Sequence, residues 1–209
     1  GLGKKWLAGV YAFLTGVAAL GIGNMVQANT VATSLYETAA LSRPIAAGLI
    51  VALVAVVILG GVKRIGRTTE YLVPFMAVLY LAGGIFILLR YIAVLPDAFA
   101  TIVSSAFTPA APVGAWGGAT VMMAMRYGIA RGIFSNEAGL GSASIIHSQA
   151  KNTPVAQGFW GIWEVCVDTL IVASITGLVI MVTGVLGEPD LSPGVLAATA
   201  FSRGLPGLG

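Results

Sequence analysis

The chain has 209 residues, of which 57% are hydrophobic and only 9% are charged, and its formal net charge is +3. Because ordinary soluble domains carry about 25% charged residues, these few charges cannot form a water-soluble surface, and we expect an integral membrane protein. The single cysteine, Cys166, excludes an intramolecular disulfide, and without a basic stripe we expect no nucleic-acid partner. The chain begins at Gly1 and has no signal-peptide pattern, so we expect an internal fragment of a longer protein.

The first long apolar stretch covers residues 6–36 and follows a short basic lead. As one helix it would measure about 46 Å, which exceeds a hydrocarbon core of about 30 Å, so it must tilt or protrude. In its second half, Asn24 and Gln27 recur on one helical face. Two interpretations stay open for these amides. They form hydrogen bonds between packed helices, or they line a substrate cavity.

Four further membrane spans are predicted, over 45–62, 71–95, 114–152 and 155–186. Between the first two of these, residues 63–67 carry three positive charges and are expected to form a loop. Pro74 is expected in the first turn of the 71–95 span, and Gly83-Gly84 permits close approach of a neighbouring helix. The segment 97–108 is too short and too rich in flanking prolines to span, and its apolar pattern favours an amphipathic helix at the membrane interface.

Five spans place successive connections on alternate sides of the membrane. One side then collects six basic residues and the other collects three: Lys4, Lys5, Lys63, Arg64, Arg67 and Lys151 against Arg43, Arg90 and Arg203. Because basic residues favour the cytoplasmic side, we expect the N-terminal end of the chain to be cytoplasmic.

The 114–152 span is interrupted by a polar, glycine-containing run at 135–142, SNEAGLGS. Such a run is not expected to continue as one regular helix. A broken helix exposes carbonyl groups at the end of its first half and N–H groups at the start of its second, which can bind a cation and a carboxylate respectively. Non-helical backbone at membrane depth is tolerated only beside protein or a water-filled cavity. The sequence therefore predicts a broken helix beside a cavity.

Glu137 is the most informative single residue of this run, because an ionisable group within a span is a candidate functional residue. It either forms a structural ion pair with Arg126 or Arg131, or contacts a substrate or a cation directly. The one histidine, His147, follows the break. It is interpreted as an interfacial histidine with satisfied hydrogen bonds, and the alternative is a proton carrier.

Two acidic residues lie in the last span, Glu164 and Asp168, which are four residues apart and therefore share a helical face. Acids inside a membrane bundle need a partner or a cation. Thr169 adds a hydroxyl oxygen next to Asp168, and hard cations such as Na⁺ prefer oxygen ligands. The alternative is a salt bridge to Arg126, Arg131 or Lys151.

Four strings of this sequence resemble one known family: GIGNMVQANTVA at 21–32, GGVKRIGRTTEYLVPFMAVLY at 60–80, RGIFSNEAGLGSASIIH at 131–147 and KNTPVAQGFWGIWEVCVDT at 151–169. They resemble the alanine or glycine:cation symporter family, also known as the sodium:alanine symporters. The resemblance covers nearly the whole chain, and FSNEAGLGS is its most specific part. It implies secondary active symport of alanine or glycine with Na⁺, or with H⁺ in some members, by alternating access across a prokaryotic plasma membrane.

The same resemblance implies an all-α integral membrane fold, the LeuT-type inverted repeat with helices one and six broken. This chain would run from helix three to helix seven of a multi-pass protein, with helix six as its broken helix, and would lack the remaining helices. The resemblance also suggests the residues that line the substrate pocket: Asn24, Met25, Gln27, Phe134, Ser135, Asn136 and Gly139. A network of Glu137, Asp168 and Thr169 is expected to hold the cation or an ion pair.

Other classes of protein are less consistent with the sequence. A channel would need a ring of like groups around an axis, whereas this chain offers one off-centre broken helix. A channel or a non-transporting membrane subunit is kept as the alternative. An enzyme is not expected, because the chain has one histidine and one cysteine, no nucleophile–histidine pair and no metal-ligand spacing.

Overall fold

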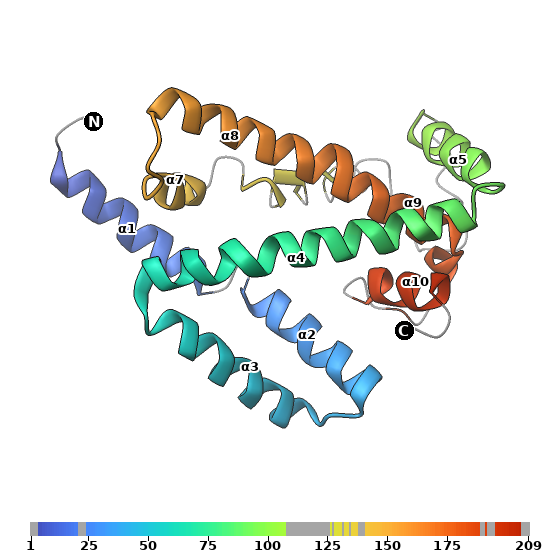
Figure 1. The fold of residues 1–209 in the computed structure, drawn as a ribbon, viewed down its shortest axis with the longest axis horizontal. Coiled ribbons are helices and arrows are strands. Elements are labelled where there is room, and N and C mark those ends of the chain that lie inside the picture. Colours follow the sequence, from blue (N-terminus) through green and yellow to red (C-terminus); the bar gives the residue numbers. More distant parts are fainter. Residues whose placement is uncertain are drawn as a thin grey trace. The chain divides into compact units, whose positions relative to one another are not determined.

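The computed structural model describes residues 4–20, 24–107, 126, 128–130, 132–133, 135–137, 141–188, 191 and 195–205. Every regular element in these residues is a helix (Figure 1). The elements are α1 (Lys5–Ala19), α2 (Asn24–Ala39), α3 (Arg43–Ile58), α4 (Gly61–Arg90), α5 (Leu95–Phe107), α7 (Ser142–His147), α8 (Pro154–Cys166), the π-helix η1 (Val167–Ala173), α9 (Ser174–Val182), the 3₁₀ turn η2 (Val185–Gly187) and α10 (Leu196–Gly204). The chain divides into a first compact unit, Gly1–Tyr80 with Glu188–Thr199, and a second, Leu81–Gly187 with Ala200–Gly209.

In the first unit, two helices take the place of the single span expected over 6–36. α1 ends at Ala19 and α2 begins at Asn24, and residues 21–23 lie outside the described part of the chain. The sequence between them contains two glycines, which weaken a helix interior. α2 and α3 then form a helical hairpin (Figure 1). Its turn contains Ala40 at φ 49°, and beside it the guanidinium of Arg43 lies 5.7 Å from the centre of the Tyr36 ring.

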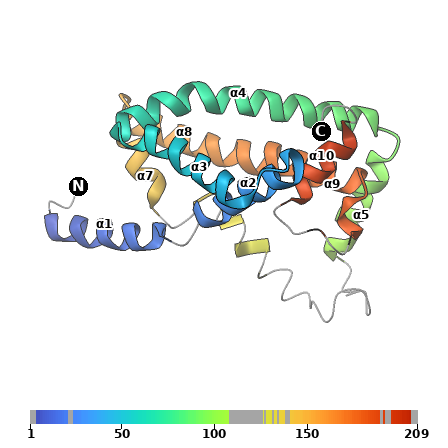
Figure 2. The same ribbon diagram turned by 90° about the horizontal axis from the view of Figure 1, so that it is seen from below.

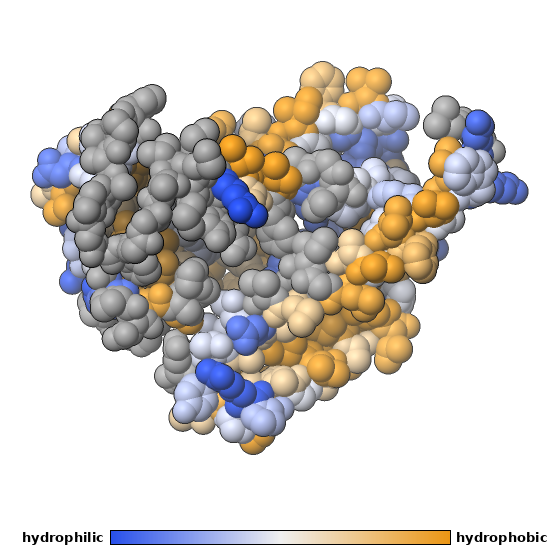
Figure 3. All heavy atoms as spheres, turned by 180° about the vertical axis from the view of Figure 1, so that it is seen from behind, coloured by the Kyte–Doolittle hydropathy of each residue, from blue (hydrophilic) through white to orange (hydrophobic). Residues whose placement is uncertain are grey.

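α3 is apolar on all sides, and most of its surface is exposed in this chain. It starts after Ser42, with proline in its first turn, where the missing N–H is harmless. Val51 is 67% exposed and Leu59, just after the helix, is 85% exposed, whereas Ala46 is fully buried. Seen from behind, the described surface of the chain carries many apolar side chains (Figure 3). A helix that is apolar all round suits contact with lipid or with other membrane helices.

α4 starts earlier than expected. The basic segment 63–67, predicted as a loop, forms the first turns of this helix instead. The preceding glycines explain the difference, because Gly61 supplies the turn with φ 71° and lysine and arginine are good helix formers. Pro74 consequently lies inside the helix and not in its first turn, and its missing N–H frees the carbonyl of Glu70.

The second unit contains a long helical rod, in which α8, η1 and α9 follow one another without a break from Pro154 to Val182 (Figures 1 and 2). This rod covers most of the span predicted over 155–186. α5, which covers the predicted interfacial segment 97–108 except its last residue, packs against α9. In the described part of the chain, the rod and α4 are the two helices long and apolar enough to cross a membrane.

Close helix contacts in the second unit depend on glycine. A Cβ at Gly84 would stand 2.5 Å from Cγ2 of Ile175, and one at Gly204 would stand 2.7 Å from Cδ1 of Ile87. Ile87 is fully buried, and the guanidinium of Arg90 donates a hydrogen bond of 3.2 Å to the carbonyl of Gly204. These contacts join α4 to α9 and to the end of α10, in the unit that also holds the candidate site.

Candidate functional site: a helix break beside a π-helix

The candidate site begins where a short helical turn ends. The N–H of Asn136 donates to the carbonyl of Gly132 at 3.1 Å, and the next residue, Glu137, has a left-handed backbone with φ 50°. Residues 138–140 lie outside the described part of the chain. Gly141 is also left-handed, with φ 75°, and α7 starts directly after it. A non-glycine residue at positive φ is uncommon and strained by roughly 1–2 kcal/mol. Such strain persists only where the surroundings hold it.

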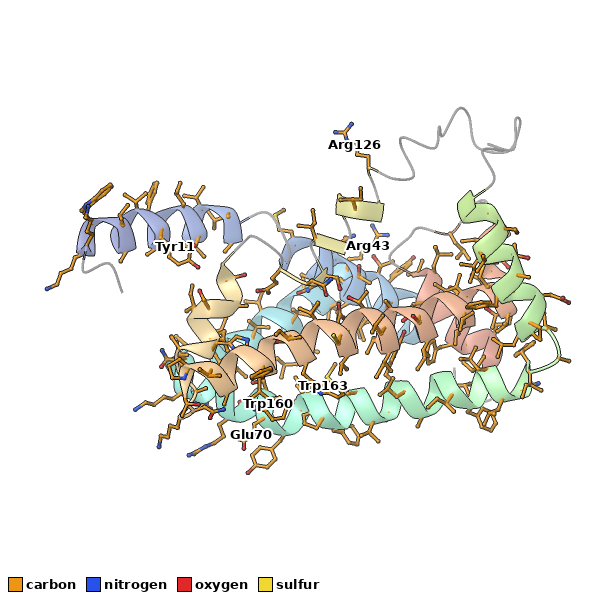
Figure 4. All side chains as sticks on the ribbon, turned by 90° about the horizontal axis from the view of Figure 1, so that it is seen from above. Tyr11, Arg43, Glu70, Arg126, Trp160 and Trp163 are labelled. Carbon is orange, nitrogen blue, oxygen red and sulfur yellow. The ribbon has the colours of Figure 1, made fainter. Side chains whose placement is uncertain are left out.

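A side-chain hydrogen bond bridges this interruption. The hydroxyl of Ser142, the first residue of α7, donates to Oε2 of Glu137 at 2.5 Å. The carboxylate of Glu137 is therefore held by the second half of the broken segment. Arg126, one of the two expected ion-pair partners of Glu137, does not lie within salt-bridge distance of this carboxylate, and it points away from α8 in Figure 4. The other expected partner, Arg131, lies outside the described residues.

Two consecutive hydrogen bonds join the turn before the break to the rod. Oγ of Ser135 donates to Oδ2 of Asp168 at 2.5 Å, and Oγ1 of Thr169 donates to Oδ1 of Asn136 at 3.1 Å. Each bond links residues 33 positions apart. The structure thus brings together four of the residues that the sequence singled out. Their oxygens form what we call the oxygen cluster: Ser135 Oγ, Asn136 Oδ1, the Asp168 carboxylate and Thr169 Oγ1.

The π-helix explains how two adjacent residues can both face the turn. Asp168 and Thr169 are the second and third residues of η1. In an α-helix neighbouring side chains diverge strongly around the axis. The wider π-helical turn reduces this divergence, and such turns occur frequently at functional sites. The residue types of this pair could be selected from the sequence, but the π-helix that lets them act together has no signal in composition or periodicity.

A second cluster ties α7 to α8 through His147. Nδ1 of its ring lies 2.7 Å from Nε2 of Gln157, and its Nε2 lies 3.2 Å from Oε2 of Glu164. Because an amide nitrogen can only donate, Nδ1 accepts and Nε2–H donates to the carboxylate. Glu164 and Asp168, expected to share one helical face, thus have separate partners. His147 is about one quarter exposed and has both ring nitrogens bonded.

Both clusters border one pocket of about 460 Å³, which lies entirely in the second unit. Its lining combines the polar groups just described with apolar walls from α7 and the rod: Ser135, Asn136, Glu137, Ala143, His147, Gly161, Trp163, Glu164, Val165, Val167, Asp168 and Val172. Trp163 is labelled in Figure 4. A small organic molecule and a cation could be accommodated together in such a volume, which is within the usual range for ligand pockets.

The other predicted site residues divide into two groups. Met25 and Gln27 are exposed residues of α2 in the first unit, and Asn24 is the first residue of that helix. Phe134 and Gly139 lie outside the residues that the structure describes. Sequence reasoning did not select Ser142 or Gln157 for the site. Gln157 had one usable signal, since it precedes Glu164 by two helical turns and therefore lies on the same face.

Comparisons with known proteins agree with the strings found in the sequence. The chain is 43% identical over 211 aligned residues to the sodium/alanine symporter AgcS of Methanococcus maripaludis, with 99% of this chain and 45% of that protein covered. It is 42% identical over 207 residues to an uncharacterized transporter of Haemophilus influenzae, covering 98% of this chain and 45% of the relative. It is 36% identical over 204 residues to the probable sodium/glutamine symporter GlnT of Bacillus subtilis, covering 97% of this chain and 42% of the relative.

The chain therefore spans slightly less than half the length of these relatives. The model of the sodium:alanine symporter family matches all of its residues, 1–209. This match confirms the family predicted from the FSNEAGLGS region and makes the chain part of a membrane transport protein. The chain belongs to the sodium:alanine symporter family, a family of transporters and not of enzymes.

Proposed function

We propose that the protein containing this chain carries out symport of a small neutral amino acid, alanine or glycine, with Na⁺ by alternating access across a prokaryotic plasma membrane. The observation that carries the proposal is the oxygen cluster between the helix break and η1. It combines one carboxylate with two hydroxyls and an amide carbonyl, and all of these are hard oxygen ligands of the kind that Na⁺ prefers. The proposed ion would be held by Asp168 and Thr169 together with Ser135 and Asn136.

The cluster is suited to reversible cation binding because its side chains form hydrogen bonds with one another when no ion is bound. Ser135 and Thr169 donate their hydroxyl hydrogens to Asp168 and Asn136 respectively. A hydroxyl can rotate and present its lone pairs instead. Binding Na⁺ would then exchange two internal hydrogen bonds for ion–oxygen contacts, and water could accept the freed hydroxyl hydrogens because both bonds are exposed. The ion would also bridge the turn before the break and the rod, so that its binding would favour one arrangement of the two elements.

The amino acid would bind at the break itself. Carbonyl groups at the end of the 132–136 turn attract the ammonium, and N–H groups at the start of the second half attract the carboxylate. Glu137, held by Ser142, would keep the two halves in register. We include Phe134 and Gly139 in the proposed lining, as well as Asn24, Met25 and Gln27 of α2. In the LeuT-type arrangement that we propose, α2 belongs to helix three and the break to helix six.

Uptake of radiolabelled alanine into proteoliposomes containing the full-length protein tests this function. An inward Na⁺ gradient should be required, and glycine should compete. Glutamine is the third substrate to include, because one relative is named a probable sodium/glutamine symporter. Uptake driven only by a pH gradient would move the coupling ion to H⁺, and flux that needs no gradient would favour the channel alternative.

A matched pair of variants tests the proposed ion site. Asp168→Asn removes the charge of the oxygen cluster but keeps an oxygen acceptor for Ser135, and the Na⁺ concentration for half-maximal uptake should rise at least tenfold. Glu164→Gln removes a charge one helical turn earlier in the same pocket, where the carboxylate contacts His147 and not the cluster. It should change the Na⁺ dependence less than threefold. Equal effects of the two variants would contradict the assignment of the ion to the cluster.

A further inference from the structure

A second hollow, of about 440 Å³, lies in the first unit at the start of α4. It is lined by Gly60, Lys63, Arg64, Arg67 and Thr68. Lys63, Arg64, Arg67 and Thr68 are spaced three and four positions apart, so they form one continuous face of α4. Gly60 belongs to the turn that precedes the helix. All three side chains with full positive charge in the first two turns of α4 border the same small volume. The proposed transport cycle makes no use of them.

The charges in this hollow are not neutralised by the described part of the chain. No carboxylate there lies within salt-bridge distance of Lys63, Arg64 or Arg67. Glu70, the one acidic residue of α4, follows the cluster on the same helix (Figure 4) and is not among the lining residues. Like charges one turn apart repel one another. These unneutralised charges therefore favour binding of an anion that the described part of the chain does not supply.

The position of the hollow along α4 indicates the membrane depth at which that anion would be found. Between Glu70 and Arg90 the helix has no charged residue, and residues 71–89 would extend about 28 Å. This length matches a hydrocarbon core of about 30 Å. Arg67 then lies about 6 Å beyond the core and Lys63 about 12 Å beyond it. The headgroup layer adds about 5–8 Å to each side of the core, so Arg67 lies within this layer and Lys63 lies just outside it.

Gly60 shapes the hollow by allowing Arg64 to fold across it. A Cβ at Gly60 would stand 1.9 Å from Cδ and 2.6 Å from Cβ of Arg64. Any other residue would thus displace the arginine side chain and shift the turn that leads into α4. The α3–α4 turn and the arginine together make one wall of the hollow. A basic segment without such a turn would present the same charges on an open helix surface.

We propose that this hollow binds the phosphate of an anionic ligand, with the headgroup of an anionic phospholipid as the source that its depth favours. Arginine presents a planar fork that grips phosphate oxygens with two parallel hydrogen bonds, and lysine adds a mobile point charge. Thr68 offers a hydroxyl donor at the same face. Each lysine or arginine near the membrane surface strengthens the affinity for anionic lipids by about fivefold. The ligand would fasten the start of α4 to one leaflet.

Native mass spectrometry of the full-length protein tests the proposal, with phosphatidylglycerol, phosphatidylcholine and inorganic phosphate as separate probes. Retention of phosphatidylglycerol should exceed that of phosphatidylcholine. The variant Lys63→Gln/Arg64→Gln/Arg67→Gln should weaken phosphatidylglycerol retention at least tenfold, and Arg64→Gln alone should weaken it roughly fivefold, as expected for one juxtamembrane charge. Arg64→Lys keeps the charge without the fork and should lose less than Arg64→Gln.

The matched control removes three other positive charges that are expected on the same side of the membrane, in Lys4→Gln/Lys5→Gln/Lys151→Gln. It should change retention less than threefold. An equal loss in both triple variants would overturn the proposal in favour of unspecific attraction, and so would no loss in the hollow variant. Hollow-dependent binding of inorganic phosphate without preference for phosphatidylglycerol would support the phosphate site and identify a soluble anion as its source.

Discussion

At the scale of single residues, Glu137 shows how the helix break is held. Its backbone is left-handed, and its carboxylate receives a hydrogen bond from Ser142 on the other side of the interruption. Contacts such as this hydrogen bond maintain the backbone strain at Glu137. A hydrogen bond to a charged acceptor stabilises a protein by roughly 1.5–3 kcal/mol when shielded from water, and by less at an exposed site. Ser142 is therefore a positioning residue for the break.

Ser142→Ala should loosen the second half of the broken segment. We expect amide hydrogen exchange over 141–147 to accelerate several-fold, because the bond that joins α7 to Glu137 is lost. Ser148→Ala is the control, since that hydroxyl makes only local hydrogen bonds, donating to the carbonyl of Ile145 and accepting from Nε2 of Gln149. Exchange that responds equally to both substitutions, or to neither, would show that the Glu137–Ser142 bond does not hold the break. Ser142→Thr keeps a hydroxyl and should restore slow exchange.

Individual site residues could be predicted from the sequence to different degrees. Asp168 was recognisable because an acid is unusual in a membrane span, and Thr169 because it adds a hydroxyl oxygen beside that acid. Ser135 and Asn136 came from the FSNEAGLGS string. The contact of Ser135 with Asp168 and that of Asn136 with Thr169 were not predictable, because each joins residues 33 positions apart and depends on tertiary packing. Ser142 was missed for the same reason, although the break that it bridges was expected.

At the scale of elements, η1 is the feature with the largest consequence that the sequence did not reveal. A π-helical turn shifts the hydrogen-bond register within an otherwise continuous helix. The apolar run from Pro154 to Val182 looks the same with or without this shift. The cluster nevertheless depends on it, since Asp168 and Thr169 both face the 135–136 turn from within η1. Elements of this kind show that residue identity alone does not determine a site.

Deletion of Leu170 tests the role of η1. Leu170 is 69% exposed and lies just after the pair, so its removal should convert the wide turn to an α-helical one without opening a core cavity. The helix on either side would keep its phase, but Asp168 and Thr169 would then diverge by about 100°, as neighbours do in an α-helix. We expect Na⁺-driven uptake to fall at least tenfold at normal expression. Leu170→Ala, which shortens the side chain and keeps the register, should retain most uptake. Full activity of the deletion variant would refute a role for the π-helix.

The close contact of α4 with the rod gives a second prediction at this scale. Gly84→Ala would place a Cβ 2.5 Å from Ile175, and overpacking of this kind destabilises by about 1–3 kcal/mol. Gly66→Ala in the same helix meets nothing within 4 Å and should stabilise α4 by about 1 kcal/mol through helix propensity. The melting temperature of the full-length protein in detergent should therefore fall for Gly84→Ala and rise for Gly66→Ala. A matching gain in both variants would contradict the contact at Gly84.

At the scale of the whole molecule, the sequence was most informative about class and family. Scarce charge indicated a membrane protein, and the strings in 21–32, 131–147 and 151–169 indicated the family that the match over 1–209 establishes. Helix boundaries were less predictable. The 6–36 stretch became α1 and α2, and the basic segment 63–67 joined α4, which begins at the left-handed Gly61. Apolar composition does not reveal such boundaries.

The division of 6–36 into two helices makes the membrane crossing of this stretch a decisive test of orientation. α1 and α2 contain 15 and 16 residues, so each would extend only about 22–24 Å, less than a core of about 30 Å. Neither is long enough to cross alone without thinning the bilayer. We therefore expect the two helices to cross once between them. Lys4 would then lie in the cytoplasm and Arg43 outside, in keeping with six basic residues on the inner side.

Single cysteines placed in a cysteine-free full-length protein measure this orientation directly. In intact cells, Arg43→Cys should react with a membrane-impermeant maleimide and Lys4→Cys should not. In inside-out vesicles the two reactivities should reverse. Lys151→Cys is the control, because the four spans predicted between Lys4 and Lys151 place the two residues on the same side. Reaction of Lys4→Cys and Arg43→Cys from the same side would mean that α1 and α2 each cross the membrane or that neither does, and the charge asymmetry derived from five spans would no longer hold.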